Sequence, residues 1–386
     1  MVLLDSWSPV TPCSVTVPLN GTLHRRGSSP TTRRAFVHHS LESVEDPRPR
    51  VLLAVDKFRG TASARALTTA LERGLEDRDV IVDAQPLSDG GEGFADAFRG
   101  EVVEVVVPGA LGEAVRVPLV LHPSPRGLVG VFSVADVVGH DARRPLTPDE
   151  ALAARSDGVG FAILEAVRFG ASAVLVGCGG SVTSDGGLGC YEVLRGAGGL
   201  SVPVSVAADV TTDFAGARRF AVQKGVATSD LTTLDQRLRA LRARYLVEGG
   251  RDVGELRGAG AAGGIAGALA ALGADVVDGF TVVAHAVGLV PRVREAAVVV
   301  TGEGRFDAGS LEGKVTVKVA ELVTRLDGLL VVGGAVEPEA ARRFDARFVG
   351  ATIVSLEQRF GAEAARLDVA WCLQRVVEEF LSLHGL

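Results

Sequence analysis

Short apolar runs recur along the chain, and most of them end in a polar loop that contains glycine. These runs are Val51–Val55, Val80–Ala84, Ala173–Val176, Val202–Ala207 and Ala297–Thr301. Stretches with apolar residues at helical spacing follow most of the runs, which indicates strands that alternate with helices. The order of strand, polar loop and helix is typical of open α/β sheets, in which ligands bind at the carboxyl ends of the strands.

A second pattern lies between the early and late runs. Val102–Val107, Ala114–Leu121 and Leu128–Phe132 are rich in residues that favour strands and are separated by turns with proline and glycine. Runs of this kind predict an antiparallel meander. We therefore expect the chain to enter a second domain near residue 100.

The division into domains follows from these two patterns. Residues 49–96 and 265–386 are expected to form one discontinuous α/β domain with an open, mostly parallel sheet of the flavodoxin or Rossmann type. Residues 97–264 are expected to form a second α/β domain that contains the meander, with a cleft between the two. Residues 1–48 are rich in serine, proline, threonine and arginine without sustained periodicity, which predicts a disordered extension. For Phe280–Val287 the pattern leaves strand and helix open.

Composition narrows the class of protein. The chain has 386 residues, of which 47% are hydrophobic and 23% charged, so a large buried core is expected. The net charge of −7 argues against a nucleic-acid surface, although basic residues can still dominate a cleft that binds an anionic small molecule. The four cysteines form no CxxC pair, and no apolar stretch reaches the ~18 residues of a membrane-spanning helix. These features predict a soluble, cytoplasmic protein that binds no membrane, and they leave a homodimer open.

Acidic, basic and hydroxyl side chains gather in the loops after the expected strands. One such loop is ordinary, but several at one sheet edge predict a cleft with phosphate cradles, cations and carboxylates, the mixture that phosphoryl transfer requires. Taken singly, each charged residue in these loops is explained equally well as a helix cap, a solvated turn charge or half of a structural salt bridge. The candidate cations are Lys57, Arg59, Lys224, Arg305 and Lys314, and the candidate carboxylates are Asp56, Asp89, Glu92, Asp185, Asp209, Glu303 and Asp307.

The longest of these loops, Gly177–Gly189, combines glycines with hydroxyls and one acid. Glycine lets main-chain N–H groups approach phosphate oxygens, and Ser181 and Thr183 add hydroxyl donors. The segment Gly258–Gly263 fits GxGxxG, but it follows a polar stretch instead of a strand, so the dinucleotide fingerprint lacks its context. Gly309–Lys314 is one residue short of a Walker A loop, which argues against a P-loop kinase.

These motifs, in this order, resemble those of the bacterial type I glycerate kinases over about residues 51–386. The resemblance implies a two-domain α/β enzyme that phosphorylates D-glycerate with ATP and Mg²⁺ and usually forms 2-phosphoglycerate. A related small hydroxy acid is the alternative acceptor. The matching segments are Asp56–Gly60, Asp89–Gly93, Gly179–Gly187, Gln223–Gly225, Gly258–Gly264 and Thr301–Asp307, followed by Gly313 and Lys314.

The kinase hypothesis gives the motif residues expected roles, although the division of roles among the acids stays open. The catalytic candidates are Asp185, Lys224, Arg305 and Asp307. The residues expected to contact ATP are Gly179, Gly180, Ser181, Thr183, Gly260, Gly263 and Lys314. Those expected to contact the substrate are Asp56, Lys57, Arg59, Asp89 and Glu92, and those expected to hold Mg²⁺ are Asp185, Asp209 and Glu303.

Three segments depart from the family pattern. Ser133 and Val134 replace a Glu-Met pair, and Arg155–Phe161 and Thr211–Phe214 also differ from the usual residues. Because a site built on polar groups rejects altered ligands sharply, a second hypothesis is a non-catalytic or substrate-switched paralogue that binds a nucleotide or metabolite. A third hypothesis, a nicotinamide-dependent oxidoreductase, rests only on the GxGxxG match.

Overall fold

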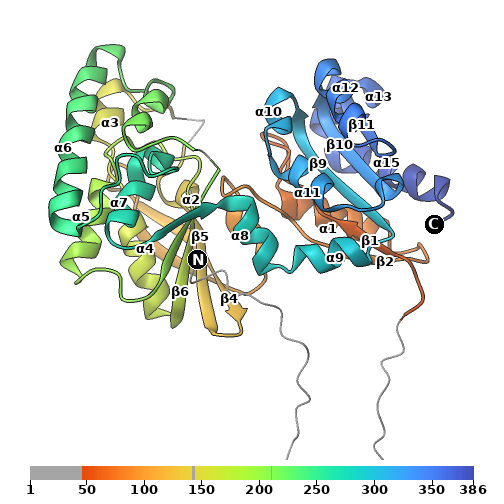
Figure 1. The fold of residues 1–386 in the computed structure, drawn as a ribbon, viewed down its shortest axis with the longest axis horizontal. Coiled ribbons are helices and arrows are strands. Elements are labelled where there is room, and N and C mark those ends of the chain that lie inside the picture. Colours follow the sequence, from red (N-terminus) through yellow and green to blue (C-terminus); the bar gives the residue numbers. More distant parts are fainter. Residues whose placement is uncertain (1–45, 141–143, 210) are drawn as a thin grey trace, which may run out of the picture.

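Two β-sheets lie side by side in the computed structural model of the protein, which describes residues 46–140, 144–209 and 211–386 (Figure 1). The first sheet is parallel throughout, with the order β11-β10-β9-β1-β2. Its strands are β1 (Arg50–Leu53), β2 (Ile81–Ala84), β9 (Val298–Phe306), β10 (Leu329–Val336) and β11 (Thr352–Ser355). Nearly all of the expected N-terminal extension lies outside the described residues.

The second sheet is mixed and has the order β3-β4-β5-β6-β7-β8. It is antiparallel from β3 to β5, which confirms the expected meander, and parallel from β5 to β8. Because β8 pairs with β7, this sheet continues past residue 264, where its domain was expected to end. Its strands are β3 (Glu101–Pro108), β4 (Ala114–Ser124), β5 (Gly127–Ser133), β6 (Ala171–Gly177), β7 (Val204–Ala208) and β8 (Asp275–Asp278).

Helices cover both sheets, as expected for the α/β class. Each sheet together with its helices is called a lobe. Those of the first lobe are α1 (Ala64–Gly74), α9 (Leu289–Glu295), α10 (Ala308–Leu311), α11 (Val315–Leu322), α12 (Pro338–Arg347), α13 (Leu356–Phe360), α14 (Ala362–Leu367) and α15 (Val369–Leu383). Helix α8 (Gly279–Ala286) packs against β7 and β8 of the second sheet and leads into α9. Those of the second lobe are α2 (Val134–Val138), α3 (Pro148–Ala153), α4 (Asp157–Arg168), α5 (Leu188–Gly196), α6 (Leu231–Gly249) and α7 (Ile265–Ala271). Short 3₁₀ turns are η2 (Phe94–Ala97), η3 (Ala215–Phe220), η4 (Val222–Lys224), η5 (Thr228–Asp230), η6 (Ala261–Gly264) and η7 (Leu326–Gly328).

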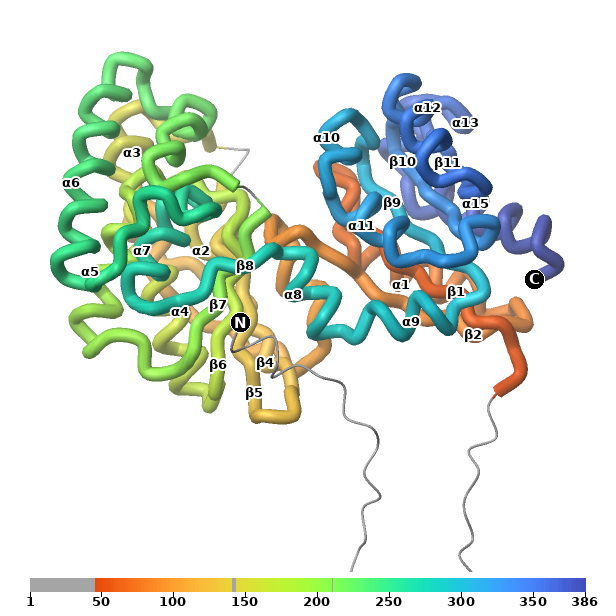
Figure 2. Tube along the Cα trace, in the orientation of Figure 1, coloured from red at the N-terminus to blue at the C-terminus, as the bar shows by residue number. Residues whose placement is uncertain are grey.

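The residues of β1 alternate between two cores, because successive side chains of a strand point to opposite faces of the sheet. Val51 and Leu53 belong to the core that α1 and α15 cover. Leu52 belongs to the core on the other face, which also includes Leu175 of the second sheet. The two lobes therefore share one hydrophobic cluster. Figure 2 shows the chain passing between them in the β2–β3 connection and again along α8 and α9.

Two local expectations are decided by the structure. The strand expected at Ala297–Thr301 continues to Phe306, because β10 pairs with it as far as Val336 opposite Phe306. The acid and base of Gly302–Phe306 therefore lie on a strand, and the expected loop at this position is wrong. The ambiguous segment 280–287 is helical as α8. Among the described residues, no helix has the length and hydrophobicity needed to cross a membrane.

Candidate active site

Three charged residues meet where β1 and β2 end. The Nζ atom of Lys57 lies 3.3 Å from Oδ1 of Asp89 and 3.8 Å from Oδ1 of Asp56. The main-chain N–H of Lys57 also donates to Oδ1 of Asp56, at 2.7 Å. Burial raises the pKa of Asp56 to about 7, and repulsion from Asp89 and Glu303 adds to this effect against the attraction of Lys57. Asp56 is therefore a buried carboxylate that can exchange a proton near neutral pH.

A second group of charges lies beside it, with Glu303 on β9, Asp307 just after this strand and Lys314 just before α11. The Nζ atom of Lys314 lies 3.6 Å from Oε2 of Glu303 and 3.6 Å from Oδ1 of Asp307. Oε1 of Glu303 is buried and has no hydrogen-bond partner in the part of the chain that the structure describes. Burial raises the pKa of Glu303. A buried carboxylate oxygen without a donor is costly unless a ligand or cation completes it.

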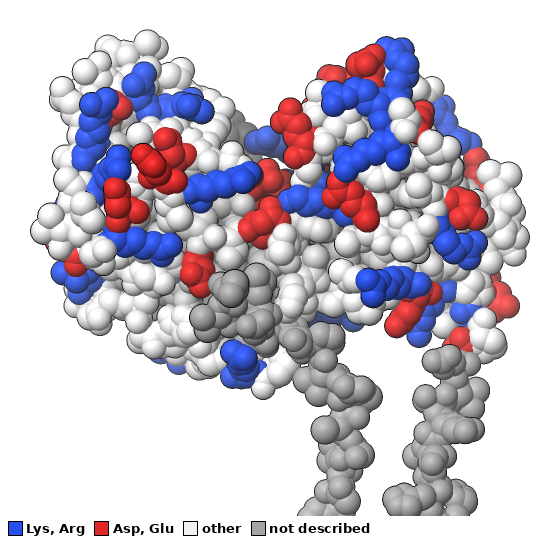
Figure 3. Space-filling view, in the orientation of Figure 1, with Lys and Arg blue, Asp and Glu red and all other residues white. Residues whose placement is uncertain are grey.

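The second sheet adds charges to the same region. Asp278, at the end of β8, accepts a hydrogen bond from Nζ of Lys318 at 2.7 Å. Asp209, just after β7, interacts electrostatically with Asp89 and Lys318. Figure 3 shows a notch between the two lobes with acidic and basic side chains at its base. The carboxyl ends of strands from both sheets thus contribute charges to one cleft, as open α/β sheets do at their binding sites.

The glycine-rich loop after β6 contacts Lys224, a half-buried residue at the end of η4. Nζ of Lys224 donates to Oγ of Ser181 at 3.0 Å and to the carbonyl oxygen of Thr183 at 2.9 Å. No carboxylate lies within ion-pair distance of this ammonium among the described residues. Burial lowers the pKa of Lys224 to about 8, against the attraction of Asp185. A buried cation with a spare donor and no paired anion is suited to an anionic ligand.

Three expected glycines hold the loops together by close packing. A Cβ atom on Gly263, whose φ is +72°, would lie 2.0 Å from the carbonyl oxygen of Thr183 and 3.1 Å from Nζ of Lys224. A Cβ on Gly260 would lie 2.3 Å from the carbonyl oxygen of Asp213. A Cβ on Gly179 would lie 2.5 Å from Cα of Gly91. Because Gly91 lies beside Lys57, the Lys224 loop is packed against the loop of the first charge group.

Gly180 lies where the glycine-rich loop after β6 contacts helix α2. Its φ is +70°, and a Cβ on it would lie 3.1 Å from Cβ of Ala135 in α2. The next residue, Ser181, forms a β-bridge with Gly139 at the other end of α2. Helix α2 is thereby fixed beside the glycine-rich loop.

Asp185 has a different environment from the one expected. Its Oδ2 accepts hydrogen bonds from the main-chain N–H of Ser156 at 3.0 Å, the Ser156 hydroxyl at 2.7 Å and the N–H of Gly189 at 3.1 Å. Its Oδ1 accepts from the N–H of Gly187 at 3.0 Å. Both oxygens are thus used to join the start of α4 to the start of α5. This arrangement favours a structural role over the metal-binding and catalytic roles expected for Asp185.

The replacement Asp185→Ala is therefore expected to lower the free energy of unfolding by about 3 kcal/mol or more, because it leaves several buried donors without an acceptor. Urea denaturation measures this change. Asp345→Ala, at an exposed position of α12, is the control and is expected to stay within about 0.5 kcal/mol of the parent protein. A stable but inactive Asp185→Ala protein would instead support the catalytic role.

Three expected site residues lie at the margin of the charge groups or outside them. Arg305 is 63% exposed and lies between Glu337 at 2.7 Å and Asp307, a member of the second group, at 3.8 Å, so its charge is largely satisfied at the surface. Arg59 is exposed and lines a cavity on α13 and α14. Glu92 is exposed and interacts with Lys57 only through longer-range electrostatics. The sequence placed these residues in the correct loops, but a loop position does not fix the direction of a side chain.

Asp136 was not among the site residues expected from the sequence. It lies on α2, and burial raises its pKa to about 6, with Asp96 and Glu92 adding repulsion. The available signal was a lone acid in the otherwise apolar helix Val134–Val138, one turn after Ser133. Asp278 was also missed, because β8 has only four residues and gives little periodicity. Lys318 lies on α11, and its pairing with Asp278 depends on how α11 and β8 lie in space.

Two of the departing segments make internal contacts. Arg155 forms ion pairs with Asp157 at 2.8 Å and Glu192 at 2.9 Å. Phe214 is buried and packs edge-on against Tyr245 at 5.8 Å between ring centroids. In these two segments, the side chains that differ from the usual pattern therefore support the scaffold.

Similarity to known proteins covers most of the chain. Residues 51–198 and 195–384 match the glycerate kinase family. The chain is 31% identical to the glycerate 2-kinase of Escherichia coli (strain K12) over 318 residues, which cover 72% of this chain and 82% of that protein. It is 36% identical to an uncharacterized protein of Mycobacterium bovis over 291 residues, covering 71% and 75%. A crystal structure from Salmonella typhimurium LT2, described as a "putative glycerate kinase 2", matches with a TM-score of 0.66 and 26% identity over 88% of this chain and 100% of that one.

Proposed function

The chain belongs to the glycerate kinase family, and we propose that it transfers the γ-phosphoryl group of ATP to D-glycerate, forming 2-phosphoglycerate. One observation supports this proposal above the others. The ammonium of Lys224 has no carboxylate partner among the described residues, and the glycine-rich loop that it contacts packs against Gly91, beside Lys57 and Asp89 of the charge group that includes the buried acid Asp56. Phosphoryl transfer needs this pairing of a cation for phosphate with a nearby proton acceptor.

We assign the proton acceptor to Asp56. A general base works best when its pKa lies close to the working pH, and that of Asp56 is about 7. Its carboxylate would accept the proton of the attacking hydroxyl, while Lys57 would stabilise the charge that results. The pair lies at a strand end, where the substrate can approach from the cleft.

The phosphate groups would be bound by two lysines, one from each lobe. Lys224 and the hydroxyl of Ser181 would donate to phosphate oxygens from the second lobe. Lys314 would act from the first lobe, where it lies between two carboxylates. Cations fixed in this way stabilise the charge that spreads over the transferring group.

The residues present also fit the Mg²⁺ that the family implies. Oε1 of Glu303 is a buried carboxylate oxygen without a protein partner in the described part of the chain, which suits one ligand to Mg²⁺. Within that part, no cluster of three His, Cys, Asp or Glu could hold a metal alone. Mg²⁺ commonly takes one or two carboxylates and completes its shell with phosphate oxygens and water. When bound, it would neutralise charge on the phosphates of ATP.

A coupled assay tests the proposal. Purified protein with ATP, Mg²⁺ and D-glycerate is expected to release ADP, and enolase alone is expected to consume the product, because enolase acts on 2-phosphoglycerate and not on the 3-isomer. ADP release with other hydroxy acids but not with glycerate would favour the substrate-switched paralogue. MgATP binding without ADP release from any acceptor would favour the non-catalytic one.

The pH dependence of kcat/KM is expected to be bell-shaped. Asp56 must be deprotonated to accept a proton, so activity rises through about pH 7. Lys224 must keep its proton to bind phosphate, so activity falls above about pH 8. Lys224→Arg is expected to remove the alkaline limb and leave the acid limb in place, because arginine stays charged. An acid limb at about pH 4 to 5, typical of an ordinary carboxylate, would contradict the role of Asp56.

A further inference from the structure

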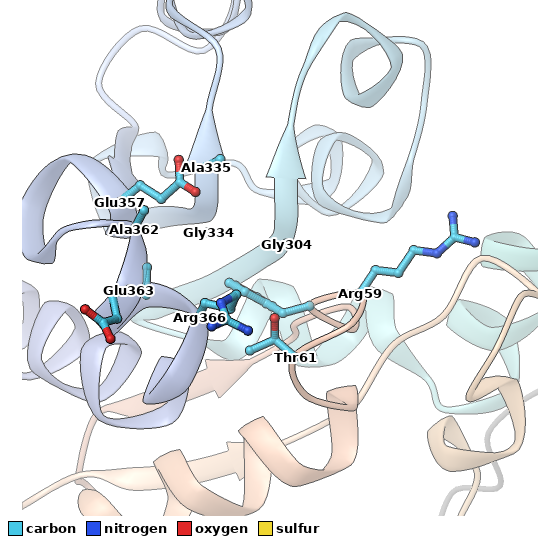
Figure 4. A pocket seen from close by; sticks show the side chains of 11 residues that line it. Arg59, Thr61, Gly304, Gly334, Ala335, Glu357, Ala362, Glu363 and Arg366 are labelled. Atoms are coloured by element: carbon cyan, nitrogen blue, oxygen red, sulfur yellow. The ribbon is translucent and has the colours of Figure 1, made fainter. Parts of the chain in front are cut away.

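A cavity of about 520 Å³ lies at the carboxyl ends of β9 and β10 and is not part of the charge groups described above (Figure 4). Its volume lies in the range of about 300–1,000 Å³ that small-molecule sites occupy. Gly304 of β9 lines it, while the preceding residue Glu303 contacts Lys314. Because successive residues of a strand face opposite sides, the cavity and the Glu303 group lie on opposite faces of one strand.

The floor of the cavity is made of main chain. A Cβ on Gly334 would lie 2.5 Å from the carbonyl oxygen of Gly304, and a Cβ on Gly304 would lie 3.0 Å from the main-chain nitrogen of Arg59. Side chains at these positions would not fit between the strands and the loop. The glycines let the loop Phe58–Arg59 and the two strands pack closely, so this side of the cavity is lined by main chain, whose N–H and C=O groups small-molecule sites use for polar contacts.

The rim carries charges of both signs. In Figure 4, Arg59 extends from the loop after β1, while Glu363 and Arg366 lie on α14 across the cavity. None of these three side chains takes part in an ion pair or hydrogen bond among the described residues. A ligand that suits this rim has hydroxyl groups for the carboxylate and an anionic group for the arginines.

We propose that this cavity binds the adenosine part of ATP. The base would lie against the main chain at Gly304 and Gly334, the ribose hydroxyls would donate to Glu363, and Arg366 and Arg59 would contact the first phosphates. The loop Asp56–Arg59 leads from the cavity to the charge group around Lys57, so the phosphate chain has a route to the proposed site of transfer. This assignment rests on the proposed function and specifies where its nucleotide binds.

The replacement Ala362→Trp tests the proposal, because Ala362 is exposed and lines the cavity, so a large ring there would fill it without entering the core. The Kd of MgATP is expected to rise about tenfold or more, and that of Mg-tripolyphosphate to change less than about twofold. Ala346→Trp, at an exposed position of α12, is the matched control and should change neither. An unchanged Kd for MgATP, or equal weakening of both probes, would overturn the adenosine assignment.

Glu363→Ala provides a second test that does not fill the cavity. The parent protein is expected to bind MgATP about tenfold more tightly than 2′,3′-dideoxy-ATP, and the variant is expected to lose this preference. Retention of the full preference would overturn the ribose contact. If MgATP binding depends on the cavity but glycerate is not phosphorylated, the proposed function fails and the adenosine site stands. If glycerate is phosphorylated and Ala362→Trp leaves the KM for ATP unchanged, the proposed function stands and the adenosine site fails.

Discussion

Replacing Asp56 by asparagine is expected to lower kcat for phosphoryl transfer to D-glycerate by about 10²- to 10⁴-fold, the usual contribution of a positioned general base. Asparagine keeps the size of the side chain and can still accept the hydrogen bond from the N–H of Lys57, but it cannot take up a proton. The KM for ATP is expected to change little, because Asp56 is assigned to the acceptor and not to the nucleotide. Steady-state kinetics with both substrates varied will measure this.

The same variant is expected to gain stability above pH 7. Burial raises the pKa of Asp56 from 3.8 to about 7, so the folded state favours the protonated form. The stability that Asp56 contributes is therefore present at low pH and is lost as the pH rises through 7. The neutral amide of the Asp56→Asn variant carries no such penalty, and the gain at pH 8 is on the order of a few kcal/mol or less.

Thermal unfolding at pH 4 and pH 8 checks the stability effect of Asp56→Asn. The difference in Tm from the parent protein should grow between these two values. Asp77→Asn, at an exposed position, is the control and should show neither the kinetic nor the thermal change. A variant that is both inactive and less stable at pH 8 would show that Asp56 supports the fold and is not the base.

Lys224→Met is expected to lower kcat/KM by about 10²- to 10³-fold. In other enzymes, the loss of one preorganised hydrogen-bond donor to a charge that forms in the transition state has an effect of this size. Methionine has a similar length and no charge. The desolvation that lowers the pKa of Lys224 to about 8 is removed with the ammonium, so stability near pH 7 should stay equal or rise. The variant therefore separates a role in catalysis from a role in folding.

Activity of folded Lys224→Met protein is the measurement, with circular dichroism to confirm the fold. Lys224→Arg is the charge-conserving partner and is expected to recover part of the activity if charge alone matters. Lys318→Met is a second comparison, because Lys318 is already paired with Asp278 and is assigned no phosphate. Full activity of Lys224→Met would remove this residue from the proposed phosphate site.

Much of the site could be predicted from local sequence. Asp56 and Asp89 follow apolar runs that the sequence marks as strands, and parallel strands bring their carboxyl ends to one edge. The glycines of the central loops were also predictable, since positive φ angles at Gly180 and Gly263 are conformations that other residues rarely adopt. Local pattern thus determined the α/β class, the meander and the edge at which the charges gather.

The tertiary structure decided the partner of each charge. Lys224 reaches Ser181 across 43 residues of chain, and Asp185 reaches Ser156 across 29, distances over which periodicity gives no information. The extension of β9 to Phe306 required β10 as its neighbour. Local propensity and spacing act within a few residues, so the sequence determined which elements form and which residues end them. The order of strands and the packing of loops determined which of those residues meet, so that Asp185 accepts hydrogen bonds from Ser156, Gly187 and Gly189, and Lys224 donates to Ser181 and Thr183.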